Sequence, residues 1–303
     1  MISFPEKVKI KEVGPRDGLQ NEAVEVPWER KVEWINLLSA AGYEYIEFSS
    51  FVHPKWIPQL KDADIVARSI DRNPGTTYAA LVPNVKGLRK ALDNGVDEVA
   101  VFMSASETHN KKNINKTINE TYPVLQEVIT ESKQEGKKVR GYISCVFGCP
   151  YEGHVPFEQT AAVAKTLLKM GVDEISLGDT IGTADPKQVD LFLEYMKERV
   201  SLEHAALHFH NTNGMALANV TVALQHGITI FDASLGGLGG CPYAEGASGN
   251  LATDDLVHML HRMGIETGIN EEKLRKAAAF LEQELGKRLP SHQRQIAAKE
   301  EVG

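Results

Sequence analysis

The sequence has few cysteines and no long apolar run. Only three of its 303 residues are cysteine, an odd and small number that fits a reducing compartment better than a disulfide scaffold. No apolar stretch approaches the roughly 18 residues that a membrane-spanning helix needs, and the first residues lack the pattern of a signal or transit peptide. The sequence therefore predicts a cytoplasmic protein with no membrane segment.

Positive charge is also scarce. The chain has 33 Lys and Arg residues against 41 Asp and Glu residues, which gives a formal net charge of −8. No basic run stands out, whereas nucleic-acid-binding proteins normally carry a basic patch. We therefore expect no nucleic-acid partner, although local positive groups could still bind a small anionic ligand.

What the chain does have is a repeated alternation of strand and helix patterns. Hydrophobic residues make up 42% of it, as in ordinary globular proteins. A short β-rich run, a loop and an amphipathic stretch recur eight times, and eight strands alternating with eight helices predict a (β/α)₈ TIM barrel. The expected strands are 8–14, 43–50, 76–83, 98–105, 139–147, 174–180, 205–212 and 229–236. The expected helices are near 28–41, 59–70, 84–94, 115–135, 156–170, 186–200, 215–226 and 253–263.

A doubly wound open sheet is the main alternative for such an alternation. That fold usually has a glycine-rich phosphate turn after its first strand, but here the first strand is followed by GPRDGLQ (14–20). No linker or shift in composition divides the chain. We expect residues 1–270 to form a catalytic barrel and residues 271–303 to form a C-terminal extension, helical at first and polar at its end.

Reactive side chains gather at the ends of the expected strands, where the active sites of TIM barrels lie. They are Arg16 and Asp17 after the first strand, Glu47 near the end of the second, Asp179 at the end of the sixth, His208 and His210 at the end of the seventh, and Cys241 and Asn250 in the loop after the eighth. The sequence therefore predicts an active site at this end of the barrel.

The pair His208 and His210 is the sharpest local signal. Strand residues two apart point to the same face, so both imidazoles could reach one metal ion. With Asp17 they would leave coordination positions open for a substrate, and Asn250 could add a neutral oxygen. This mixed set of nitrogen and oxygen ligands favours Mg²⁺ or Mn²⁺ over Zn²⁺ or Co²⁺. The alternative is a pair of histidines hydrogen-bonded in a polar layer.

Three charged residues near this site allow both a catalytic and a structural interpretation. Arg16 could stabilise a developing oxyanion or form a salt bridge with its neighbour Asp17. Glu47 and Asp179 could titrate, accept a hydrogen bond from a substrate, or simply hold Arg16 in place. The sequence alone does not separate these roles.

The glycine-rich segment GGLGGCPYAEGASGN (236–250) is the second sharp signal. A glycine-rich loop can close over a substrate, and an exposed thiol such as Cys241 can be reactive. The motif GCPY also occurs at 148–151, so a simple turn with an inert cysteine is the alternative. Lys111 and Lys112, after the fourth strand, form a basic pair on an expected loop, suited either to phosphates or to solvent.

Taken together, these segments resemble 3-hydroxy-3-methylglutaryl-CoA lyases. The matching stretches are KEVGPRDGLQNE (11–22), SFVHPKWIPQ (50–59), KKNIN (111–115), SCVFGCPYEG (144–153), EISLGDTIG (174–182), HFHNTNGMALAN (208–219) and GGLGGCPYAEGASGNLATDDLVHML (236–260). The resemblance implies cleavage of 3-hydroxy-3-methylglutaryl-CoA, an acyl-CoA, to acetoacetate and acetyl-CoA. It also implies a divalent metal, and we expect a homo-oligomer.

The resemblance also implies roles for individual residues. Asp17, His208 and His210 match metal ligands, and Asn250 matches a ligand or near-ligand. Arg16 matches the residue that stabilises the enolate of the product, and Cys241 matches the thiol that protonates it. Glu47 and Asp179 match acidic residues of the active site. Either His208 or Asp17 could be the base that takes the hydroxyl proton.

The chain departs from the family pattern at two positions. The family commonly has H-x-H-D-T after the seventh strand, followed by Tyr or Arg, whereas this chain has Asn211 and Asn213 at the Asp and Tyr/Arg positions. By strand alternation Asn211 points away from the histidines and should not be a metal ligand. Two alternatives stay open: a lyase, aldolase or Claisen synthase acting on a related 3-hydroxy acyl-CoA or hydroxy acid, or a barrel that binds metal and acyl-CoA without turnover.

Overall fold

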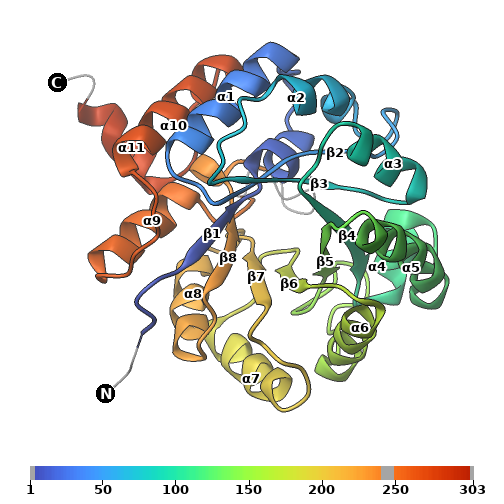
Figure 1. The fold of residues 1–303 in the computed structure, drawn as a ribbon. Coiled ribbons are helices and arrows are strands. Elements are labelled where there is room, and N and C mark those ends of the chain that lie inside the picture. The colour runs from blue at the N-terminus through green and yellow to red at the C-terminus, as the bar shows by residue number, and fades with distance from the viewer. Residues whose placement is uncertain (1–3, 240–248, 301–303) are drawn as a thin grey trace.

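The computed structural model describes residues 4–239 and 249–300, and its strands close into one barrel (Figure 1). All eight strands are parallel and pair in chain order, and β8 pairs with β1 to close the sheet. They are β1 (Lys9–Glu12), β2 (Tyr45–Ser50), β3 (Thr77–Leu81), β4 (Glu98–Ser104), β5 (Lys138–Ser144), β6 (Glu174–Asp179), β7 (Ala205–Phe209) and β8 (Ile230–Ala233). The predicted TIM barrel is confirmed, and the doubly wound alternative is wrong because the sheet is closed.

Helices surround the barrel as an outer ring (Figure 1). The expected eight are α1 (Trp28–Ala40), α2 (Ala63–Ser69), α3 (Val85–Asp93), α5 (Ile118–Gln134), α6 (Phe157–Met170), α7 (Pro186–Lys197), α8 (Ala216–Gln225) and α9 (Thr253–Arg262). Within the described ranges, no helix is both long enough and apolar enough to cross a membrane.

Two helices form where the sequence pattern predicts none. The segment with Lys111 and Lys112 is not a loop but the helix α4 (Glu107–Ile114). It starts because the hydroxyl of Ser106 accepts the backbone N–H of His109, a standard N-cap contact. Its apolar content is too low to give a helical period, so only this cap marks it in the sequence. Likewise, α11 (His292–Glu300) lies within the expected polar tail.

The apolar core lies between the strands and the helices, as α7 illustrates. The Asp185 side chain accepts the Gln188 N–H (2.9 Å) and caps the helix, and Pro186 occupies the first turn, where no N–H is needed. Four apolar residues recur at the spacing of one helix face and are buried against the barrel: Val189, Phe192, Leu193 and Met196. The amphipathic pattern therefore fixes which side of α7 faces inward.

The inside of the barrel is polar and charged. We call Lys11, Glu98, Arg140, Glu174 and Asp232 the lower interior, because they lie below the C-terminal ends of the strands, which we call the mouth. Lys11 Nζ lies 2.8 Å from Glu174 Oε1, Arg140 Nε lies 2.6 Å from the same oxygen, and Arg140 Nη2 lies 2.6 Å from Asp232 Oδ1. Burial and Arg140 lower the pKa of Lys11, and the carboxylates offset part of this effect. These ion pairs connect β1, β5, β6 and β8 inside the barrel.

The C-terminal segment packs on the outside of the barrel. The helix α10 (Glu271–Leu285) lies beside α1 (Figure 1). Beyond it, Arg294 Nη2 donates to Glu282 Oε2 at 2.7 Å, and the Ser291 hydroxyl donates to Asp254 in α9. The Ser291 N–H also donates to Gly236 O (3.2 Å) in the short 3₁₀ turn η3 (Leu235–Gly237). This segment is therefore tied to the chain just after β8.

Candidate active site

A single π-helical turn after β1, η1 (Gly14–Gly18), carries Arg16 and Asp17 to the mouth of the barrel. A Cβ on Gly14 would lie 2.6 Å from Glu12 Oε1, and one on Gly18 would lie 2.9 Å from a methyl carbon of Leu238. Both positions therefore need glycine because the turn is packed too tightly for a side chain. The GPRDG motif fixes where the two charged residues point.

The buried carboxylate of Glu12 anchors this turn from below. Its Oε1 accepts the N–H groups of Gly14 (2.8 Å) and Leu235 (2.9 Å), and its Oε2 accepts the hydroxyls of Tyr43 and Thr253, each at 2.8 Å. Burial raises the pKa of Glu12 to about 7, although these four hydrogen bonds oppose the rise. Glu12 thus joins η1 to the segment after β8, and the sequence reasoning did not single it out.

Arg16 is buried between two carboxylates. Its Nε donates to Glu47, its Nη1 donates to Asp17, and its guanidinium carbon lies 5.2 Å from the centre of the Tyr142 ring. Burial disfavours the charge on Arg16, but Glu47 and Asp17 outweigh it and hold its pKa above the usual value. The Tyr142 hydroxyl also donates to Glu47. The contacts of Glu47 are those expected of a residue that holds Arg16 in place.

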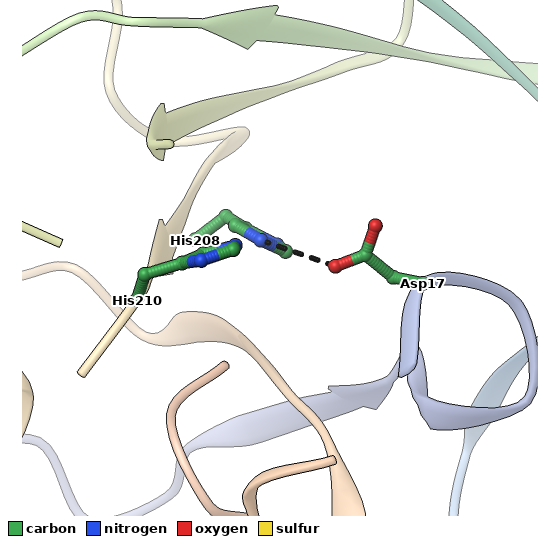
Figure 2. A group of neighbouring side chains, drawn as sticks. All are labelled: Asp17, His208 and His210. Atoms are coloured by element: carbon green, nitrogen blue, oxygen red, sulfur yellow. Dashed lines mark ion pairs between the residues drawn. The ribbon is translucent and has the colours of Figure 1, made fainter. Parts of the chain in front are cut away.

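Asp17, His208 and His210 form the metal-competent cluster at the mouth (Figure 2). One ligand atom from each residue lies within 4.8 Å of the others, and Asp17 Oδ2 lies 3.7 Å from His208 Nε2. The ring centres of the two histidines are 5.2 Å apart, as expected for alternate residues at a strand end. Burial would raise the pKa of Asp17, but Arg16 and the two histidines lower it to about 2. Asp17 is therefore held as a carboxylate.

Two polar atoms around this cluster are buried without a hydrogen-bond partner. They are Nδ1 of His210 and Oδ1 of Asn250. Burial, with the neighbouring His208, lowers the pKa of His210 to about 4, so its imidazole is neutral near pH 7 and keeps a free lone pair. Asn250 instead turns its Nδ2 towards Asp17 Oδ2 (2.9 Å) and Leu238 O (3.1 Å). Rotating this amide by half a turn would exchange its nitrogen for its oxygen beside Asp17.

Behind His208 lies a contact that the sequence reasoning missed. The Nδ1 atom of His208 lies 3.2 Å from Asp232 Oδ2, and Asp232 also accepts the Ser176 hydroxyl (2.8 Å) and binds Arg140. Burial would raise the pKa of Asp232, but Arg140 and His208 keep it well below its usual range. A carboxylate on one ring nitrogen leaves the other nitrogen, Nε2, to face Asp17. Only the alignment of β7 beside β8 reveals this pair.

The structure does not place two of the predicted site residues, Asp179 and Cys241, in the cluster. Asp179 is fully buried and accepts the backbone N–H groups of Thr183 (3.2 Å) and Ala184 (3.1 Å), so its carboxylate is directed at the turn that follows β6. Burial raises the pKa of Asp179 to about 6, although these hydrogen bonds oppose the rise.

Cys241, predicted as a reactive thiol, lies outside the residues that the structure describes.

Asn211 lies next to the cluster but faces away from it. Its Oδ1 accepts the backbone N–H of Ala216 (3.1 Å) at the start of α8, and its own N–H donates to Gly249 O (2.7 Å). The prediction that Asn211 is not placed as a metal ligand agrees with this geometry. The residue instead shapes the turn between β7 and α8.

A hollow of about 330 Å³ opens over the cluster. Arg16, Asp17, His208 and His210 line one side of it, and His109 from α4 also lines it. A second hollow of about 570 Å³ adjoins the first and includes Trp56, which is 79% exposed, and Lys112. Four residues line both hollows: Val52, Ile57, Phe102 and Asn113. The two hollows together form a groove that leads from the cluster to the surface.

Comparison with known proteins gives the family of this chain. Residues 7–281 match the family model described as HMGL-like. The hydroxymethylglutaryl-CoA lyase YngG of Bacillus subtilis is 56% identical over 295 residues, which cover 97% of this chain and 99% of that protein. This chain belongs to the hydroxymethylglutaryl-CoA lyase family. The predicted family and its class, carbon–carbon lyase, are therefore confirmed.

Solved structures of this family have the same fold. The crystal structure of the Bacillus subtilis HMG-CoA lyase has a TM-score of 0.96 and 55% identity, covering 97% of this chain and 99% of that one. An HMG-CoA lyase from Acinetobacter baumannii, solved in complex with coenzyme A and 3-methylmalate, has a TM-score of 0.91 and 39% identity, covering 97% and 96%. The family resemblance thus extends over nearly the whole barrel.

Proposed function

We propose that this chain cleaves 3-hydroxy-3-methylglutaryl-CoA to acetoacetate and acetyl-CoA, with Mg²⁺ or Mn²⁺ bound at the mouth of the barrel. One observation supports this most: a metal-competent cluster lies directly beside a buried guanidinium, since Arg16 donates to Asp17. Cleavage of the bond between C2 and C3 of this thioester needs a metal ion to bind the hydroxyl and a cation to stabilise the enolate. The family of the chain supplies the substrate class.

The residues around the cluster fit a divalent ion. Asp17, His208 and His210 would hold it, and Asn250 would join them after the half-turn of its amide. The unpartnered Nδ1 of His210 and Oδ1 of Asn250 are buried atoms of the kind that a metal satisfies. When bound, such an ion polarises the hydroxyl and carboxylate oxygens of a substrate.

The reaction itself follows from the position of the charged residues. Asp17 and His208 face each other within the cluster, and either can accept the proton of the tertiary hydroxyl. As the hydroxyl becomes a carbonyl, the bond between C2 and C3 breaks, and its electron pair moves onto C2 and the thioester oxygen as an enolate. Arg16, held by Glu47, stabilises this negative charge.

Protonation of C2 completes acetyl-CoA, and the other fragment is acetoacetate. We propose Cys241 as the proton donor, on the basis of the family motif alone, since this residue lies outside the described ranges. Of the two described cysteines, Cys145 is a poor donor because burial raises its pKa to about 12. Replacing Cys241 with Ala should slow product formation without unfolding the protein.

The test is a product assay with 3-hydroxy-3-methylglutaryl-CoA, in which acetoacetate and acetyl-CoA are quantified separately. Chelation with EDTA should abolish turnover, and Mg²⁺ or Mn²⁺ should restore it. His210→Ala should weaken Mn²⁺ binding by well over tenfold, because loss of even an outer partner of a metal ligand costs 10–100-fold. His204→Ala, at an exposed histidine before β7, is the matched control. Full activity in metal-free protein would rule out the metal, and absence of both products would rule out the substrate.

The predictions of a homo-oligomer, a cytoplasmic location and an acyl-CoA substrate need experiments of their own. A homo-oligomer stays a prediction that light scattering of the purified protein can test. The cytoplasmic location also stays a prediction. The acyl-CoA specificity is tested by replacing the substrate in the same assay with a panel of related 3-hydroxy acyl-CoA esters.

A further inference from the structure

His109 is a buried histidine that the proposed reaction does not use. It lies in the first turn of α4, is 5% exposed, and lines the same hollow as Arg16, Asp17 and His208. Its Nδ1 atom is buried and has no hydrogen-bond partner. Because Nδ1 is enclosed, Nε2 is the polar atom of this ring that is left to meet a ligand in the hollow.

The surroundings of His109 set its protonation state. Burial lowers its pKa below 6.5, although the charge of Glu152 opposes this, so the ring is neutral near pH 7. A neutral imidazole carries one N–H and one lone pair. Because Nδ1 is enclosed without an acceptor, the proton is expected on Nε2. The ring is held by its neighbour Tyr151, whose ring centre lies 6.2 Å away.

The position of α4 indicates which part of a ligand His109 would meet. The helix follows β4, which lies across the barrel from β8, and the metal-competent residues follow β1 and end β7. The hollow that the cluster lines extends to His109, so a substrate held at the cluster by its reacting end can reach α4 across the mouth. Asn113, one helical turn beyond His109, lines both hollows, so this route continues to the surface.

We propose that His109 is a specificity-determining residue whose Nε2–H donates a hydrogen bond to a carbonyl oxygen of the acyl-CoA, either the thioester carbonyl or the nearest amide carbonyl of the pantetheine arm. The inference rests on the proposed acyl-CoA substrate, but it assigns a recognition role to a residue outside the metal cluster. It also gives α4 a function in holding the substrate.

The experiment compares His109→Phe, which keeps a ring beside Tyr151 but removes the donor, with His109→Gln, which keeps an N–H donor. His109→Phe should lower kcat/KM for 3-hydroxy-3-methylglutaryl-CoA by about tenfold, mainly through KM, as expected for one lost hydrogen bond. His109→Gln should recover a large part of this loss. His154→Phe makes the same change at an exposed histidine outside both hollows and should leave kinetics unchanged.

Two further arms identify the carbonyl and separate this inference from the proposed reaction. The first arm uses the N-acetylcysteamine thioester of the same acid, which ends after the first amide. If His109→Phe lowers kcat/KM as much with this thioester as with the CoA ester, the contact is to the thioester carbonyl or that amide. If kcat/KM falls only with the full CoA ester, the assignment to these two carbonyls is overturned. Calorimetric titration with acetyl-CoA needs no cleavage, so weaker binding by His109→Phe supports the contact even if turnover is absent. Kinetics and acetyl-CoA binding within twofold of the original protein, with an unchanged Tm, would overturn the proposal.

Discussion

The two ends of the barrel interior treat buried polar groups differently. In the lower interior, Lys11, Arg140 and Asp232 each lie close to an oppositely charged partner. At the mouth, Nδ1 of His210 and Nδ1 of His109 have no partner. Unpartnered atoms occur elsewhere too, such as Trp34 Nε1, but these two imidazoles border an open hollow. Charged groups are paired at both ends, as Arg16 is with Glu47 and Asp17, but the mouth also keeps two imidazole nitrogens that the fold itself does not use.

Asp232→Asn should have the largest effect, because it breaks the paired end. The change removes the charge that faces Arg140 at 2.6 Å, in a site with no exposed surface, and leaves a buried guanidinium short of a partner. We expect the free energy of unfolding to fall by about 3–5 kcal/mol, measured by urea denaturation. Glu194→Gln, which breaks an exposed pair with Lys197, should cost less than about 1 kcal/mol. Equal effects of the two changes would contradict the role of the lower interior.

Arg16→Gln should act on chemistry at the mouth. Loss of the cation that faces the developing enolate should lower kcat by roughly 10²–10³ or more, equivalent to about 3–4 kcal/mol. Mn²⁺ affinity, measured by calorimetry, should stay nearly intact because Arg16 is not a ligand. If kcat is unchanged and only the Tm falls, Arg16 is a structural partner of Asp17 and Glu47.

Glu12→Gln should test the anchor of η1 beneath the mouth, because it replaces a buried group that titrates with one that does not. The folded-state pKa of Glu12 is raised from 4.5 to about 7, so its stabilising contribution is complete below 4.5 and is lost as pH rises through 7. Between these values stability should fall by about 1.4 kcal/mol per pH unit, or about 2 kcal/mol from about pH 5.5 to pH 7. A glutamine can accept from two N–H groups and donate to two hydroxyls, so the variant should fold.

The measurement for Glu12→Gln is urea denaturation at several pH values. The original protein should lose stability over the stated window, and the variant should show a flatter profile. The same slope in both proteins would show that Glu12 does not titrate there.

Asn211→Asp should have the smallest effect. It adds one negative charge several Å from the cluster on a side chain that faces Ala216, where salt screening and an effective dielectric near 20 leave about 1 kcal/mol. We expect a less than tenfold change in kcat/KM and a slightly tighter metal site. A gain of two or more orders of magnitude would show that Asn211 had disabled the site, and would favour binding without turnover.

The sequence predicts the strands, and the residues that gather at the mouth of the barrel, for a physical reason. Apolar period and turn residues mark each strand, and parallel strands in a barrel must bring their C-terminal ends together. That rule alone places Asp17, His208 and His210 within reach of one another, as the structure confirms. The metal itself and the roles of these residues stay predictions.

Side-chain contacts between neighbouring strands and loops could not be predicted in this way. The pairing of Asp232 with His208 depends on how far β8 is shifted along β7, which no local pattern records. The helix α4 is polar, so its residues carry no helical period, and His109 was overlooked with it. Lys112 lies 4.4 Å over the Tyr151 ring, a contact that joins two segments far apart in the sequence.

The closure of β8 on β1 has a consequence for how the protein is made. Glu12 pairs with Ala233, so about 220 residues must be synthesised before β1 gains its second neighbour. At a synthesis rate of about 5–20 residues per second, this edge waits roughly 10–40 s on the ribosome. During that time Glu12, which anchors η1, lacks its hydrogen bonds from Leu235 and Thr253. The nascent chain must therefore carry an open sheet edge for most of its synthesis, and the mouth can be assembled only after β8 and α9 have left the ribosome.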